Sequence, residues 1–155
     1  MKEEKESNNF YEIINEGGIC KPISFKDYDI FKEQNKYSVC KIIKDNKHYG
    51  TGFLCLIPFP DKRSQLPVLI TCNHVLTKED IKIGKEINLN FVDIYYNKKL
   101  YIDKSRKIYT NDKKYDLTII EIKEDDGFKI SKMLKIDNKI NDLDSEQYNK
   151  YMLII

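Results

Sequence analysis

The sequence has no long hydrophobic run, and this absence excludes several classes of protein. None of its apolar stretches approaches the roughly 20 residues that a membrane-spanning helix needs. The first residues, "MKEEKESNN", are charged and lack the apolar core of a secretory signal peptide. We therefore expect a cytoplasmic protein that does not associate with membranes.

Charge of one sign is not in excess either, because 27 Lys and Arg residues stand against 25 Asp and Glu residues. The formal net charge of +2 is too small to favour nucleic acid or an anionic membrane as a partner. One basic segment, "NKKLYIDKSRK" (97–107), concentrates positive charge on an expected strand pair. Charged strand edges ordinarily protect against aggregation, so we expect no nucleic-acid partner.

Cysteine is scarce, and its spacing carries no metal motif. The four cysteines form no Cys-x-x-Cys pair and show no zinc-like spacing; they are Cys20, Cys40, Cys55 and Cys72. Without a signal peptide the compartment is expected to be reducing, so we predict free thiols. We expect no cofactor and no bound metal.

The 155 residues suffice for one domain with a usable core, and their pattern is mostly that of strands. After the capping residue Ser24, apolar residues at helical spacing predict a short helix over about 25–35. Alternating or β-branched runs then predict the strands 36–43, 48–59, 68–71, 86–96, 98–109 and 115–122, with further candidates at 133–136 and 151–155. Short strands joined by polar turns indicate an antiparallel barrel or sandwich.

His74 lies within the segment "VLITCNHVL" (68–76), where an apolar run gives way to a turn. The sequence has only one other histidine, His48. Imidazole acts as a general base near neutral pH when its tautomer and orientation are fixed. A carboxylate that accepts the Nδ1 proton fixes both. Asp116 begins the apolar run "DLTII", whose burial is expected to carry the carboxylate into a low-dielectric setting. These two residues are the candidate catalytic pair.

Three segments in order, "GTGFLC", "PVLITCNHVL" and "KYDLTIIEI", resemble the trypsin/chymotrypsin-like serine proteases. More narrowly, they are similar to the disulfide-poor branch of intracellular and bacterial trypsin-like peptidases. The resemblance covers roughly residues 37–137. It implies an antiparallel six-stranded β-barrel, the first of two, which would follow the short helix predicted over about 25–35. It also implies that His74 is the catalytic base, that Asp116 is the orienting acid, and that residues 50–53 form the supporting strand.

The resemblance also shows what this chain does not supply. In that family the nucleophile is a serine that follows the aspartate in a Gly-x-Ser-Gly setting, where backbone amides converge on the oxyanion. After Asp116 the chain has only Ser131 and Ser145, neither flanked by glycine, and no cysteine. We therefore expect the half of a trypsin-like serine endopeptidase that carries the His and Asp, inactive alone.

The expected organisation follows from this interpretation. Residues 1–23 are a tail, residues 24–137 are the first barrel with its leading helix, and residues 138–155 are a connector or the start of a missing second barrel. A peptide or protein substrate would bind once a second barrel completes the enzyme.

Two alternatives stay open. The chain is a non-catalytic interaction module if its apolar C-terminal segment "YMLII" forms an exposed edge that pairs with a partner chain or with a second copy. A metal site through Cys72, His74 and other thiols ranks lower, because a tight site needs about four ligands.

Overall fold

The structure, a computed structural model, describes residues 24–44, 47–92 and 94–136. The chain divides into two units, Met1–Lys32 and Glu33–Ile155. The predicted tail (1–23), the predicted connector (138–155) and the apolar segment 151–155 lie outside the described residues. In the described part of the chain no helix is long and apolar enough to cross a membrane.

The predicted helix is present as α1 (Phe25–Tyr37). Ser24 caps it, since the Asp27 amide donates to Ser24 Oγ at 3.1 Å. The helix continues past the predicted end at residue 35 because the Ser38 amide donates to the Gln34 carbonyl at 2.8 Å. The strand predicted to begin at residue 36 therefore begins at Val39 instead.

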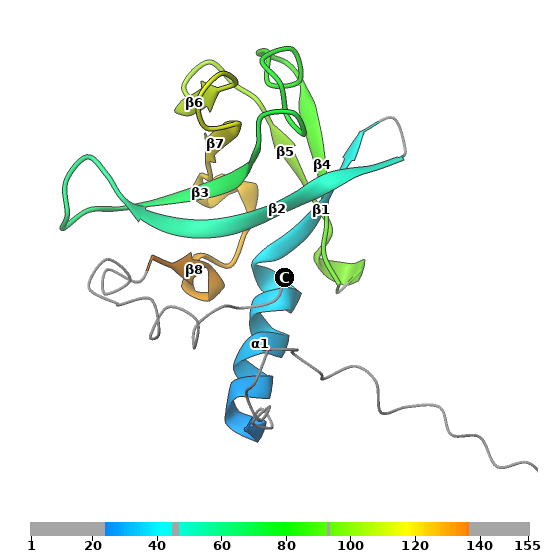
Figure 1. Cartoon of the computed structure of the whole chain (residues 1–155), viewed down its shortest axis with the longest axis vertical. Helices are drawn as coiled ribbons and strands as arrows, with labels where there is room; N and C mark the ends of the chain where they lie inside the picture. Colours follow the sequence, from blue (N-terminus) through cyan, green and yellow to red (C-terminus); the bar gives the residue numbers. More distant parts are fainter. Residues whose placement is uncertain (1–23, 45–46, 93, 137–155) are drawn as a thin grey trace, which may run out of the picture. The chain divides into compact units, whose positions relative to one another are not determined.

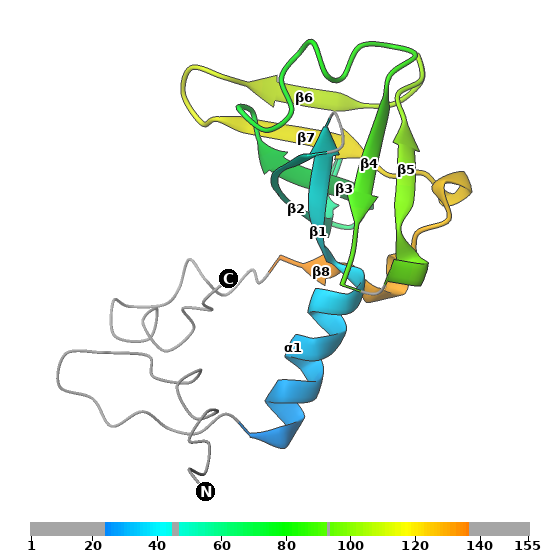
Figure 2. The same ribbon diagram turned by 90° about the vertical axis from the view of Figure 1, so that its right-hand side faces the viewer.

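The structure describes eight strands, and the fold is mainly β (Figure 1). They are β1 (Val39–Lys44), β2 (Lys47–Pro58), β3 (Gln65–Cys72), β4 (Glu86–Asn90), β5 (Lys98–Tyr101), β6 (Ile108–Asn111), β7 (Leu117–Glu121) and β8 (Leu134–Lys135). The sheet runs in the order β5-β4-β1-β2-β3-β7-β6, and β8 pairs with β2. Every pairing except that of β2 with β8 is antiparallel, as the sequence predicts. Figure 2 shows that the sheet curls rather than lying flat.

Two predicted strands are shorter than expected. The strand predicted over 86–96 ends at Asn90, and the chain forms a 3₁₀ turn, η1 (Ile94–Tyr96), instead. The Asn97 side chain closes this loop by accepting from the Phe91 amide at 2.9 Å. Tyr96 turns inward, where it is buried and packs edge-on against Phe91 at 4.9 Å between ring centroids.

The strand predicted over 98–109 is also interrupted, and its two halves are β5 and β6. Asp103 interrupts it, because its carboxylate accepts from both the amide and the hydroxyl of Ser105 at 2.7 Å. Such a short-range side-chain bond favours a turn over a strand ladder.

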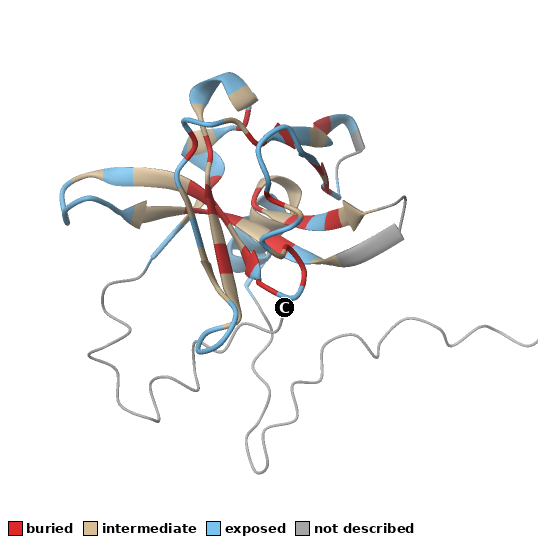
Figure 3. Cartoon of the chain, turned by 90° about the horizontal axis from the view of Figure 1, so that it is seen from above, coloured by how far each residue is buried: buried red, intermediate tan, exposed pale blue. Residues whose placement is uncertain are grey.

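The core lies within the curled sheet (Figure 3). Alternate residues of the central strands point into it, and each such aliphatic side chain contributes roughly 1.5–3 kcal/mol by burial. The fully buried side chains of this kind include Ile42, Leu54, Leu69, Leu89, Leu100 and Ile120. The strands that flank the histidine turn are thus anchored from inside.

Candidate active site

His74 lies in the turn that follows β3. The amides of Val75 and Leu76 both donate to the Cys72 carbonyl, at 3.1 and 3.2 Å, so the chain coils into a single helical turn. Val75 and Leu76 are buried in the core, whereas His74 between Asn73 and Val75 is exposed. The apolar residues of "VLITCNHVL" therefore hold the turn, and the imidazole points outward from it.

The start of β7 is bonded to this turn through two buried polar side chains. The Asn73 amide side chain donates to Thr118 Oγ1 at 3.1 Å, and Thr118 Oγ1 donates to the Leu76 carbonyl at 2.8 Å. Both Asn73 and Thr118 are buried, so these bonds form where water does not compete. They fix the turn after β3 against the strand that Asp116 precedes.

Asp116 has an unusual backbone conformation. Its φ is +45°, the left-handed region that aspartate tolerates better than most residues. Its carbonyl accepts from the Asn73 amide at 2.9 Å. The strained backbone at Asp116 turns its carboxylate toward His74, so the surrounding hydrogen bonds maintain a conformation that costs free energy.

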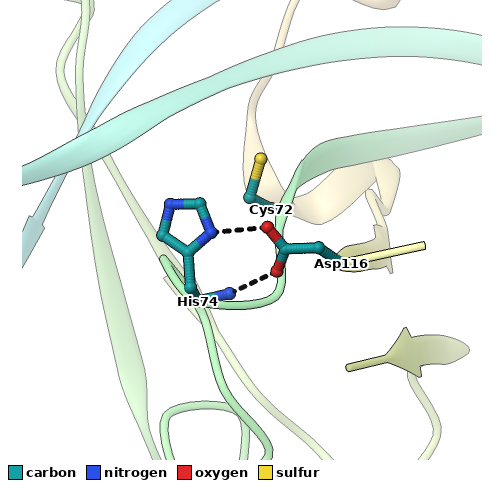
Figure 4. Close-up of side chains that lie close together, drawn as sticks. All are labelled: Cys72, His74 and Asp116. Carbon is teal, nitrogen blue, oxygen red and sulfur yellow. Dashed lines mark hydrogen bonds and ion pairs between the residues drawn. The ribbon is translucent and has the colours of Figure 1, made fainter. Parts of the chain in front are cut away.

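The carboxylate of Asp116 holds His74 by two bonds (Figure 4). One oxygen, Oδ2, lies 2.6 Å from Nδ1 of the imidazole, and the other, Oδ1, accepts from the His74 amide at 2.9 Å. The structure thus brings together two side chains that are 42 residues apart in the sequence. One carboxylate orients both the backbone and the ring of the histidine.

This arrangement selects one tautomer of the imidazole. A carboxylate only accepts, so Nδ1 carries the proton and Nε2 keeps its lone pair in the neutral ring. Nε2 lies on the side of the ring away from Asp116 (Figure 4). His74 is therefore set to accept a proton at Nε2 from a group that approaches the exposed side of the ring.

The carboxylate is less buried than the sequence predicts. The side chain of Asp116 is 47% exposed and that of His74 is 71% exposed. The prediction that burial places the Asp116 carboxylate in a low-dielectric setting is therefore wrong. The reason is position: Asp116 precedes β7 at its open end, and burial begins only with the residues that follow. The bond from the His74 ring, and then that from its amide, hold the pKa of the Asp116 carboxyl below its ordinary value.

Residues 50–53 lie beside this site, as predicted, on the part of β2 that pairs with β1. Gly50 faces the turn after β3: a Cβ placed there would lie 2.5 Å from Cγ2 of Val75. Thr51 accepts from Thr71 Oγ1 at 2.8 Å through its carbonyl, which joins β2 to β3 just before Cys72. Glycine at position 50 is required because the backbone of β2 approaches Val75 so closely.

We predict that Gly50→Ala lowers the free energy of unfolding by about 1–3 kcal/mol, the usual cost of overpacking a core. Val75 is buried and β-branched, so it cannot rotate away from the added methyl group. Urea denaturation followed by circular dichroism measures the effect. In the double variant with Val75→Ala the new methyl group fills the vacated space, so the loss should be smaller than the sum of the single losses. Thr51→Val, on the exposed side of β2, is the control; simple additivity in the double variant would contradict this explanation.

The sequence interpretation missed Asn73 and Thr118, which carry the connection between the two strands. The signal was present in both cases, as a polar residue within an apolar run: Asn73 in "VLITCNHVL" and Thr118 in "DLTII". A buried polar side chain needs a partner, and each is the partner of the other.

The thiols differ in their surroundings. Cys40, Cys55 and Cys72 are free, as the sequence predicts. Burial raises the pKa of Cys40 to about 12, which makes that thiol a poor nucleophile and ligand. Cys72 is exposed, and its sulfur, one ring nitrogen of His74 and one carboxylate oxygen of Asp116 all lie within 4.8 Å of one another.

No protein-family model, curated protein or solved structure matches this chain.

Proposed function

We propose that this chain is the first barrel of a trypsin-like serine endopeptidase, in which His74 is the general base and Asp116 its orienting acid. The observation that carries the proposal is the pair of hydrogen bonds between one carboxylate and one histidine, at 2.6 Å to Nδ1 and 2.9 Å to the backbone amide. A carboxylate in this position fixes the productive tautomer and stabilises the imidazolium that forms when Nε2 takes up a proton.

The order of the strands supports a six-stranded barrel. The two ends of the sheet are β5 and β6, which are consecutive in the chain and joined by residues 102–107. This connector bonds to both sides: Ile102 donates to the Lys85 carbonyl, and Glu121 donates to the Lys107 carbonyl, each at 2.9 Å. If β5 and β6 are counted as two halves of one bent strand, the seven strands in the order of the sheet become six. The first and the last strand of that order are then the same strand, so the sheet closes on itself as a barrel.

The exposure of the pair fits a site that a second barrel covers. The proposed reaction needs a nucleophilic hydroxyl within hydrogen-bonding reach of Nε2 and amides that bind the oxyanion. Within the 155 residues no Gly-x-Ser-Gly follows Asp116, so the proposal assigns these groups to a second domain. A covering domain would also exclude water and strengthen the bond between His74 and Asp116.

The test has two parts, and the first determines the coding sequence on both sides of this segment. An adjoining frame with Gly-x-Ser-Gly is expected, and a protein that includes it should hydrolyse a peptide ester and react with a serine-directed organophosphorus probe. His74→Ala should abolish hydrolysis, while the control His48→Ala should retain it. The 155-residue chain alone should hydrolyse no peptide ester.

Two results would overturn the proposal. One is a complete coding sequence without any such serine motif, in a protein that hydrolyses nothing. The other is hydrolysis of a peptide ester that persists in the His74→Ala variant of the extended protein.

The interaction-module hypothesis rests on the absent nucleophile and on the apolar segment 151–155, and that segment lies outside the described residues. The geometry of His74 and Asp116 favours the enzymatic proposal, because docking requires neither a fixed tautomer nor a strained aspartate.

A further inference from the structure

Cys72 stands beside the His74–Asp116 pair, and we propose that these three side chains together bind a divalent transition-metal ion, with Zn²⁺ the ion that their donor atoms favour. The sequence hypothesis of a metal site counted only Cys72 and His74 within this region. The structure adds the carboxylate of Asp116, which raises the number of neighbouring ligands from two to three.

The backbone already holds the three residues close together. Cys72 pairs with Leu117 across β3 and β7, so it lies one residue away from Asp116 in the ladder. His74 follows two residues after Cys72, and its amide is bound to the Asp116 carboxylate at 2.9 Å. The positions of all three Cα atoms are thus set by the sheet and the turn, before any ion arrives.

The side chains need only small rotations to form a zinc site. Donor atoms around tetrahedral zinc, at about 2.0–2.3 Å from the ion, lie about 3.3–3.6 Å from one another. The sulfur, a ring nitrogen and a carboxylate oxygen are now within 4.8 Å of one another, and Nδ1 is 2.6 Å from Oδ2. Because all three side chains are exposed, these movements leave the core packing unchanged.

The kinds of donor select the metal. A thiolate, an imidazole and a carboxylate together suit Zn²⁺, whereas Mg²⁺ and Ca²⁺ prefer sites made of oxygen alone. Three protein ligands leave the fourth tetrahedral position to water, which is the arrangement of open zinc sites. We therefore expect an affinity in the micromolar range, weaker than that of a closed four-ligand site.

Metal binding stands on these donors and does not depend on the proposed endopeptidase function. It has a consequence for that function, because an ion bound to His74 and Asp116 replaces the proton that they share. His74 would then be unable to act as the base.

The experiment is a titration of the reduced 155-residue protein with Zn²⁺ by calorimetry and with Co²⁺ by absorption spectroscopy. We expect one ion per chain, and with Co²⁺ a charge-transfer band from the Cys72 thiolate. Cys72→Ser should remove the band, and both Cys72→Ser and His74→Ala should weaken Zn²⁺ binding by at least about tenfold, since losing a group that merely orients a ligand already costs that much.

The chain offers matched controls for both variants. His48→Ala removes the other histidine, and Cys20→Ser removes a thiol far from the cluster in sequence, so neither should change the titration. Circular dichroism of each variant verifies that the fold is retained. The proposal is overturned if the wild-type protein binds no Zn²⁺ at micromolar concentrations, if the band survives in Cys72→Ser, or if a control variant abolishes it. Failure here leaves the endopeptidase proposal standing, because that proposal is tested by hydrolysis.

Discussion

Replacing Asp126 with alanine is expected to lower the free energy of unfolding by about 3–5 kcal/mol, because it removes the bidentate partner of a buried cation. Only the longer ion pair with Asp103, at 3.6 Å, then remains to the Arg106 guanidinium. The guanidinium of Arg106 is only 2% exposed, and it bonds to both oxygens of Asp126, at 2.7 and 2.8 Å. Arg106 also donates to the Glu121 carbonyl at 2.6 Å, so it joins the turn after β5 to the end of β7. Urea denaturation of the purified variant measures the loss.

The exposed pair of Glu86 and Lys99 is the control for this prediction. Their charged atoms lie 2.7 Å apart, but both side chains are about half exposed or more, so Glu86→Ala should cost about 1 kcal/mol or less. The combined variant Arg106→Met/Asp126→Leu removes both charges at once and should regain most of the stability that Asp126→Ala loses. Equal losses in Asp126→Ala and Glu86→Ala would show that burial of Arg106 is not the cause.

Replacing Asp116 with asparagine is expected to lower kcat about 10⁴-fold in the extended protein that supplies the nucleophile. The asparagine oxygen can still accept from the His74 amide, but its NH₂ group now faces Nδ1. Nδ1 must then accept, and the proton moves to Nε2, where it blocks removal of a proton from the nucleophile. The measurement is steady-state hydrolysis of a peptide ester, with Asp112→Asn as the control for loss of an exposed carboxylate.

The same substitution has a readout in the 155-residue chain. In the wild-type protein the Nδ1 proton of His74, held 2.6 Å from Oδ2, should give a proton magnetic resonance signal far downfield. This signal should disappear in Asp116→Asn and remain in Asp112→Asn. A fall in kcat of less than tenfold, with the signal lost, would mean that the bond orients the ring without contributing to the reaction.

Much of the secondary structure follows from local sequence. Ser24 caps α1 as its side chain predicts, and the apolar run around Leu54 places β2 to within one residue at each end. The run around Leu69 locates the centre of β3, but the strand begins at Gln65, three residues before the predicted start. The interruptions were missed because they depend on single polar residues. Asn97 and Asp103 end strands by bonding to nearby backbone amides, a local competition that hydrophobic periodicity does not register.

The candidate pair was identifiable from the sequence because His74 follows one apolar run and Asp116 precedes another, and both runs were predicted to be buried strands. Their types and order indicated a base and an acid. The sequence also established that no Gly-x-Ser-Gly follows Asp116 within these 155 residues, since this is a matter of residues and not of folding.

Only the tertiary structure decided how the pair is held. Whether two side chains 42 residues apart meet depends on the pairing of β3 with β7, and so does the presence of Cys72 beside them. The exposure of Asp116 also depends on the tertiary structure. The burial of a residue at a strand end is set by what packs over that end and not by the apolar run that follows the residue. Local patterns specify which faces of the chain avoid water, whereas the distances between distant residues arise only when those faces pack together.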